Sequence, residues 1–291
     1  MENFNNETFT QMVTDCINDA FYVKELSNRG KLKVIRQLGE IVLRRILDLS
    51  EKEYLTLGDE KVRKKLKTQS NSNKFLLDSI DSIKLLGNEA THTQKVKEFT
   101  GIEFEESVDS LFNMYSYLFI VFFEEYEFGY NDSIMSAFSI LPPAIRFKVL
   151  DYLYENKFKD NVYVIDKLVL SIIKSKSKEE AIVWVEERKS TLQLMSSVSE
   201  EAMENYRINY DDELTDHIVY NSLNMFDLCN EKIDLVSQQI EEKGKRYTTF
   251  ENAIELYKKI GIVKGNTIEI KRFNSIMEFI YMGRKQEKMN Y

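Results

Sequence analysis

The stretch LKVIRQLGEIVLRRILDL (residues 32–49) places an apolar residue at about every third or fourth position, with charged residues between them. An α-helix turns once every 3.6 residues, so this spacing gathers the apolar side chains on one face. We therefore predict an amphipathic helix that buries one side in a core and carries Arg44 and Arg45 near its end. The chain has only two prolines and ten glycines among 291 residues, which favours an all-α fold.

Similar periodicity predicts helices on both sides of this stretch, and two turn-like segments indicate where the chain divides. FGYNDS (128–133) and LPP (141–143) separate long helical patterns, so we predict a helical bundle over 1–129 and a second helical domain over 130–291. The predicted helices cover about 7–28, 32–49, 74–86, 104–128, 143–156, 162–174, 178–190, 193–207, 212–242 and 250–259.

One segment near the end has a different pattern. IGIVKGNTIEI (260–270) alternates apolar and polar residues around a turn, which predicts a small β-hairpin in the second domain. Because it follows a helical pattern, the hairpin is either the wing of a winged-helix unit or a hairpin packed against neighbouring helices. Both interpretations stay open at this level.

Composition excludes some classes of protein and indicates the compartment. The net charge of −8 excludes a polycation that coats nucleic acid, so any contact with nucleic acid requires a local basic patch. The apolar run LFNMYSYLFIVFF (111–123) is shorter than the roughly 20 residues of a membrane span, so we predict a buried core helix and no membrane partner. With two distant cysteines, Cys16 and Cys229, and a polar N-terminus, we expect a cytoplasmic protein.

LLGNEATH (85–92) holds one of the two histidines and is the first candidate site. Gly87 is suited to end the helix over 74–86, and Asn88 is suited to cap a following helix. His92 would then lie one turn inside, beside main-chain N–H groups that bind phosphate, and would act as a general acid or base on RNA. In the alternative interpretation Asn88 caps the helix and His92 only packs against a neighbouring helix.

A basic segment, KVRKKLK (61–67), is the second candidate. Its cations can contact phosphates, whereas the alternative is a solvated helix face, and no aromatic side chain is interleaved to stack on bases. The predicted nucleic-acid-binding residues are Lys61, Arg63, Lys64, Lys65 and Lys67. Asp212, Asp216 and His217 could hold a metal, but acidic helix starts have the same appearance, and we predict no metal site and no cofactor.

Residues 30–128 resemble a helical domain found in type I restriction subunits and other bacterial defence proteins, which belongs to the HEPN superfamily. The resemblance rests on an arginine-bearing amphipathic helix, followed by a Gly-Asn-x-x-x-His element that opens a helix. The matching residues here are Arg44, Arg45, Gly87, Asn88 and His92. This resemblance implies a HEPN-like bundle that forms a homodimer and belongs to a bacterial or phage-encoded defence system, with a partner protein of that system or RNA as its ligand.

Many members of that superfamily are metal-independent ribonucleases with an arginine shortly before the histidine. Here Leu85, Leu86 and Gly87 occupy the corresponding positions, so the usual arginine is missing. We therefore expect a non-catalytic interaction or regulatory module that contacts nucleic acid. The alternative is a divergent endoribonuclease of the abortive-infection type, with His92 as acid or base, Asn88 to orient it, and Arg44 or Arg45 as the phosphate-binding cation.

Overall fold

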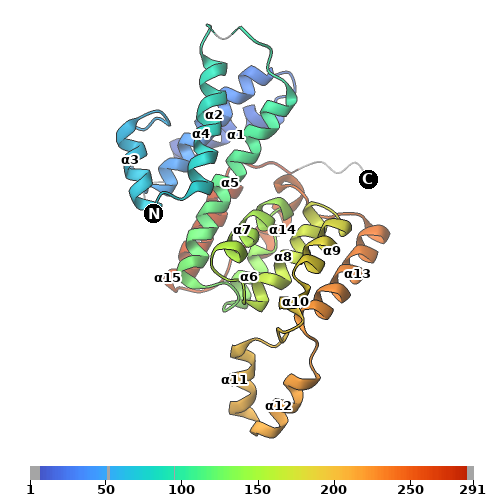
Figure 1. Cartoon of the computed structure of the whole chain (residues 1–291). Helices are drawn as coiled ribbons and strands as arrows, with labels where there is room; N and C mark the ends of the chain where they lie inside the picture. Colours follow the sequence, from blue (N-terminus) through green and yellow to red (C-terminus); the bar gives the residue numbers. More distant parts are fainter. Residues whose placement is uncertain (1–6, 51–52, 95, 287–291) are drawn as a thin grey trace. The chain divides into compact units, whose positions relative to one another are not determined.

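The computed structural model describes residues 7–50, 53–94 and 96–286, and all of its named elements are helices (Figure 1). They are the α-helices α1 to α15 and one π-helical turn. Within the described residues, the only β contact is an isolated antiparallel bridge between Ser196 and Asn224. The prediction of an all-α fold is therefore confirmed for these ranges.

The chain divides into two compact units. The first comprises the chain up to Phe122 and again from Ile254 onwards, and the second comprises Phe123–Ala253. This division differs from the predicted boundary at 129/130, because the last helix belongs to the first unit and not to a second, consecutive domain. Two helices, α5 (Gly101–Tyr126) and α14 (Phe250–Ile260), carry the chain from one unit to the other.

The first unit contains the amphipathic helix predicted from the apolar repeat. The Ser27 side chain caps this helix by accepting a hydrogen bond from the N–H of Gly30. Leu32, Ile35 and Leu38 on its apolar face are fully buried, which confirms the prediction. Besides the shared α5 and α14, the elements of this unit are α1 (Glu7–Ile17), the π-helical turn η2 (Asn18–Tyr22), α2 (Asn28–Ile46), α3 (Glu60–Gln69), α4 (Lys74–Thr91) and α15 (Ile268–Tyr281).

Aromatic side chains join α5 to α15. The ring of Phe273 lies 5.9 Å from that of Phe119 and 5.5 Å from that of Phe122, measured between centroids, and Tyr115 meets Phe279 edge-on at 6.4 Å. These contacts explain why the end of the chain groups with the beginning. The apolar run over 111–123 is thus a core helix, as predicted, and among the described helices none is both long and apolar enough to cross a membrane.

The β-hairpin predicted over 260–270 is absent, and with it the wing of a winged-helix unit. Thr267 accepts a hydrogen bond from the N–H of Ile270 and thereby begins α15 inside the predicted second strand. The amide of Asn274, one turn further on, donates to the carbonyl of Val263 at 2.8 Å and accepts from its N–H at 2.9 Å. A side chain therefore satisfies the main-chain groups that a partner strand would otherwise have paired.

The second unit is organised around α8. This helix packs against α7, α9 and α13, and an ion pair between Lys232 and Asp166 links α13 to α8. Proline begins α7 at Pro143, as predicted. The helices of this unit, besides the ends of α5 and α14, are α6 (Asp132–Phe138), α7 (Pro143–Asn156), α8 (Val162–Ser175), α9 (Lys178–Glu187), α10 (Lys189–Leu192), α11 (Glu200–Asn209), α12 (Asp212–Asn221) and α13 (Met225–Lys243).

Two short helices of this unit, α11 and α12, form a helical hairpin that extends from the rest of the unit (Figure 1). The chain enters and leaves it through a narrow neck, where the N–H of Met225 donates to the carbonyl of Met195 at 2.8 Å and the N–H of Ser197 donates to that of Leu223 at 3.1 Å. The single helix predicted over 212–242 is therefore interrupted, and Asn224 caps the second part, α13.

Candidate functional site

The GNEATH segment lies at the end of α4 and does not open a helix. α4 continues from Lys74 through Gly87 and Asn88 to Thr91, and the N–H of His92 donates to the carbonyl of Asn88 at 3.0 Å. The prediction that Gly87 ends a helix and Asn88 caps the next one is therefore wrong. A helix N-terminus offers unpaired N–H groups to an anion, whereas a C-terminus offers carbonyls. The phosphate site predicted for this segment consequently has no N-terminus to form it.

Gly87 has a packing role that replaces its predicted turn role. A Cβ atom at this position would lie 2.6 Å from Cβ of Arg36 on α2, well inside van der Waals contact. At Gly39, one turn further along α2, a Cβ atom would lie 3.1 Å from the side chain of Ile83. The absence of side chains at these two crossing points lets α2 and α4 approach closely, in antiparallel directions.

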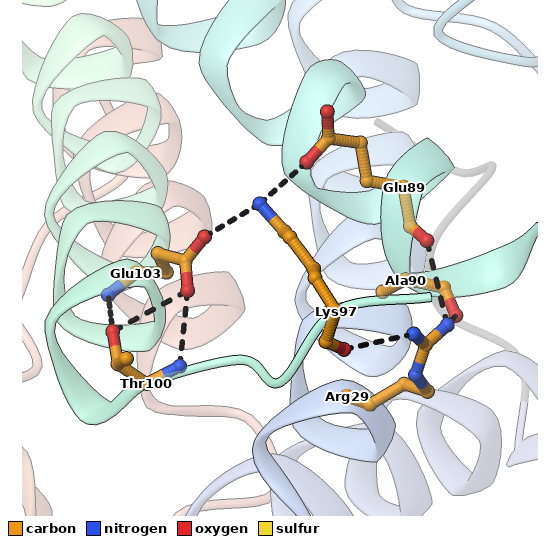
Figure 2. Close-up of polar contacts among 6 residues, drawn as sticks. All are labelled: Arg29, Glu89, Ala90, Lys97, Thr100 and Glu103. Carbon is orange, nitrogen blue, oxygen red and sulfur yellow. Dashed lines mark hydrogen bonds and ion pairs between the residues drawn. The ribbon is translucent and has the colours of Figure 1, made fainter. Parts of the chain in front are cut away.

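A polar network closes the end of α4 and holds the segment that follows it (Figure 2). The guanidinium of Arg29 donates to the carbonyls of Ala90 at 3.0 Å, Lys97 at 3.2 Å and Glu89 at 3.5 Å. Lys97 in turn forms ion pairs with the carboxylates of Glu89 at 2.7 Å and Glu103 at 2.8 Å. Arginine at a helix C-terminus satisfies carbonyls that have no partner within the helix.

The same network begins α5. The carboxylate of Glu103 accepts from the N–H of Thr100 at 3.0 Å, and the hydroxyl of Thr100 accepts from the N–H of Glu103 at 3.5 Å, which is a capping box. Hydrogen bonds from Lys97 and from the Thr100 N–H hold the pKa of Glu103 below its ordinary value. The partners of Arg29 and Lys97 thus lie both before and after His92 in the sequence and have a structural role. His92 itself is exposed.

The predicted catalytic residues do not come together within one chain. Arg44 lies eight residues beyond Arg36 on α2, and His92 lies five residues beyond Gly87 on α4, in the opposite direction. At about 1.5 Å per residue, Arg44 and His92 are on the order of 20 Å apart along the helix pair. Asn88, one turn from His92, is half-buried. The structure thus places Asn88 beside His92 and separates both from the arginines.

Each predicted arginine has a local partner instead. Arg44 donates to the carbonyl of Ser50 and closes the turn after α2. Arg45 donates to the hydroxyl of Ser275 on α15 at 2.7 Å, and its guanidinium lies 5.9 Å from the centroid of the Phe279 ring. Burial lowers the pKa of Arg45 from its ordinary value. The Arg45 side chain is therefore directed toward α15 and not toward α4.

The basic segment forms α3, a helix that the apolar pattern did not predict. Asp59 caps it by accepting from the N–H groups of Lys61 at 2.7 Å and Val62 at 3.2 Å. Leu66 anchors it to the core with only 1% of its surface exposed. Arg63 forms a two-fold hydrogen-bonded ion pair with Asp81 on α4, which includes a contact of 2.6 Å and raises the pKa of Arg63.

The remaining cations of α3 face solvent. Lys61, Lys64, Lys65 and Lys67 are all exposed. At about 100° per residue, the first three lie within an arc of roughly 100° on the side opposite the buried Leu66, and Lys67 lies beside Lys64. Of the five predicted nucleic-acid-binding residues, the structure thus gathers the four lysines on one face and assigns Arg63 a structural partner. Asp81 cannot be identified as the partner of Arg63 from the sequence, because only the fold brings it opposite Arg63.

No group of three His, Cys, Asp or Glu side chains within the described residues is arranged to hold a metal ion, and this includes Asp212, Asp216 and His217. No family model matches the sequence, and neither a curated protein nor a solved structure matches it. The resemblance to HEPN-superfamily domains therefore rests on the quoted residues alone.

Proposed function

We propose that the protein is a non-catalytic interaction module that contacts the phosphate backbone of nucleic acid through the exposed lysine face of α3. The observation that carries this proposal is the arrangement of Lys61, Lys64, Lys65 and Lys67 on one side of an anchored helix. Lysines contact phosphates as point charges and release counterions when they do so. That the protein forms a dimer and belongs to a defence system stays a prediction, supported by the resemblance of residues 30–128 to HEPN-superfamily domains.

The fixed position of α3 supports a contact of this kind. Three interactions hold this helix: the cap from Asp59, the burial of Leu66 and the ion pair of Arg63 with Asp81. The four lysines are therefore presented together. α3 contains no aromatic side chain, so contacts with bases by stacking are not expected. Binding should therefore depend strongly on salt and weakly on sequence.

Direct titration of a labelled oligonucleotide tests the proposal. The four lysines are replaced together by glutamine, and fluorescence anisotropy measures the affinity for a 20-nucleotide single-stranded RNA over a series of salt concentrations. Removing one lysine–phosphate interaction should reduce the slope of log K against log salt by about 0.7 on a single strand. We expect the variant to bind at least about tenfold more weakly at low salt, with a slope smaller by about two to three.

A matched variant separates the lysine face from the overall charge. Lys243, Lys258, Lys259 and Lys264 are also exposed lysines, and replacing them by glutamine changes the net charge by the same amount. We expect this control to retain most of the affinity of the wild type. Equal reductions of affinity in the two variants, or no binding by the wild type at low salt, would contradict a role for α3.

A further inference from the structure

The first unit contains a cavity of about 320 Å³ at the end of α2, which α5 and α15 complete. Two arginines line it, Arg45 from α2 and Arg272 from α15, together with the carboxylate of Asp48. Its volume falls at the lower end of the range for small-molecule sites. The cavity is separate from α3 and from His92, because neither contributes to its lining.

Arg45 and Arg272 bring two positive charges to one cavity. Arg45 is fixed by its hydrogen bond to Ser275 and by the ring of Phe279, so its guanidinium has little freedom to turn away. Burial lowers the pKa of Arg45, and the positive charge of Arg272 acts in the same direction. The carboxylates of Asp48 and Glu278 act on the pKa of Arg45 in the opposite direction. Glu278 does not line the cavity, and the charged residues that do line it, Arg45, Arg272 and Asp48, carry a net charge of +1.

The other walls of the cavity are apolar or aromatic. Tyr117 and Val121 on α5 and Ile276 on α15 contribute to the lining beside the charged residues. Such a combination suits a ligand that has a charged head and an apolar body. Each guanidinium group is a planar fork of hydrogen-bond donors. Two of them together suit a phosphate group, which has several oxygens, better than they suit a ligand carboxylate, which has two.

We propose that this cavity binds a small organic phosphate monoester, with the phosphate on Arg45 and Arg272 and the apolar body against Tyr117 and Ile276. The proposal is independent of the contact between α3 and nucleic acid. It assigns Arg45 the phosphate-binding role that the sequence indicated, but with Arg272 and not His92 as its partner.

Phenyl phosphate is a suitable probe, since it joins a phosphate monoester to an aromatic body. Isothermal titration calorimetry with the full chain should show binding of phenyl phosphate, weaker binding of inorganic phosphate and no binding of phenol. Removal of a charged hydrogen-bond donor typically weakens binding by about tenfold or more, which is the effect we expect for Arg272→Met. The exposed neighbour Lys271 provides the control, and Lys271→Met should bind as the wild type does.

Two further variants keep the test decisive if Arg272→Met fails to fold. Arg272→Lys retains the charge but loses the planar fork, and should bind more weakly than the wild type. Asp48→Asn removes the carboxylate that lines the cavity, at a position with a φ of 49°, which asparagine tolerates, and should bind more tightly. Absence of phenyl phosphate binding at millimolar concentration, or unchanged affinity in Arg272→Lys and Asp48→Asn, would overturn the proposal.

Discussion

At the scale of single residues, Gly87 links the sequence motif to the packing of two helices. Replacement by alanine would normally favour a helix by about 1 kcal/mol. Here the new methyl group would lie 2.6 Å from Cβ of Arg36, so α2 and α4 would have to separate. Because overpacking costs about 1–3 kcal/mol, we expect Gly87→Ala to lower the free energy of unfolding, measured by urea denaturation.

Gly101 provides a control for the helix propensity itself. It begins α5, and a Cβ atom there would meet nothing within 4 Å. We expect Gly101→Ala to leave the free energy of unfolding unchanged or slightly higher. Equal stability of Gly87→Ala and Gly101→Ala would show that the packing of α2 against α4 does not require a glycine at position 87.

The ion pair between Arg63 and Asp81 predicts a specific dependence on pH. The guanidinium holds the pKa of Asp81 below its ordinary value of 3.8. A lowered carboxyl pKa stabilises the folded state above the ordinary pKa, and this contribution disappears as the pH falls through the lowered value. Since both partners are partly exposed, Asp81→Asn should cost at most about 1 kcal/mol at pH 7, and this cost should shrink as the pH falls below 3.8, measured by urea denaturation.

The same substitution also tests the charge balance of α3. Asp81→Asn removes the carboxylate partner of Arg63, so RNA affinity should rise and the salt slope should increase by up to about 0.7. Asp78 is an exposed carboxylate on α4, the helix that also carries Asp81. Asp78→Asn is the control with the same change in net charge. Equal gains in the two variants would show that only the overall charge matters.

Local sequence patterns identify only some residues of the candidate site. Arg45 stands out by its place on an amphipathic helix, and the four lysines of α3 by their place in a short basic segment. Asn88 misleads, because a glycine before a good capping residue looks like a helix boundary. Only the position of Arg36 on another helix explains why Gly87 lies inside α4, and no local pattern contains that information. Arg272 escapes prediction for the same reason, since it is far from Arg45 in sequence.

At the scale of elements, strong apolar periodicity predicts helices well. α2, α7 and α8 begin and end within a few residues of the predicted positions. α3 escapes prediction because its only buried apolar residue is Leu66, so it has a basic face without an apolar repeat. The hairpin prediction over 260–270 is wrong because alternation over a few residues does not distinguish a strand from a loop held by the side chain of Asn274.

The helical hairpin of α11 and α12 is an element whose removal should leave the rest of the fold intact. No residue of α11 is buried, and Thr215 is the buried residue of α12. The ends of the hairpin already meet, at the bridge between Ser196 and Asn224. We expect deletion of 197–223, with an Asn-Gly linker in its place, to change the thermal midpoint by less than about 3 °C, measured by circular dichroism.

A buried residue of the neck that the deletion retains provides the comparison. Met225 has none of its surface exposed, and Met225→Ala should lower the free energy of unfolding by about 2–5 kcal/mol. A deletion that destabilises the protein as much as Met225→Ala would show that α11 and α12 contribute to the core of the second unit.

At the scale of the whole molecule, charge is distributed unevenly. The chain has a net charge of −8, yet α3 presents four exposed lysines on one face. The net charge of such a molecule repels a polyanion while the lysines of α3 attract it, so contact should be orientated and sensitive to salt. The predicted dimer would double this face, and the two copies would then engage a nucleic acid together.

The length of RNA recovered from the complex tests the central claim most directly. Wild type and His92→Ala, in excess over a labelled 20-nucleotide RNA and with EDTA present, are incubated until binding is complete, and the RNA is then sized on a denaturing gel. A module that contacts RNA through α3 without cleaving it predicts intact RNA after incubation with either protein. Shorter products that appear with the wild type and are absent with His92→Ala would contradict it.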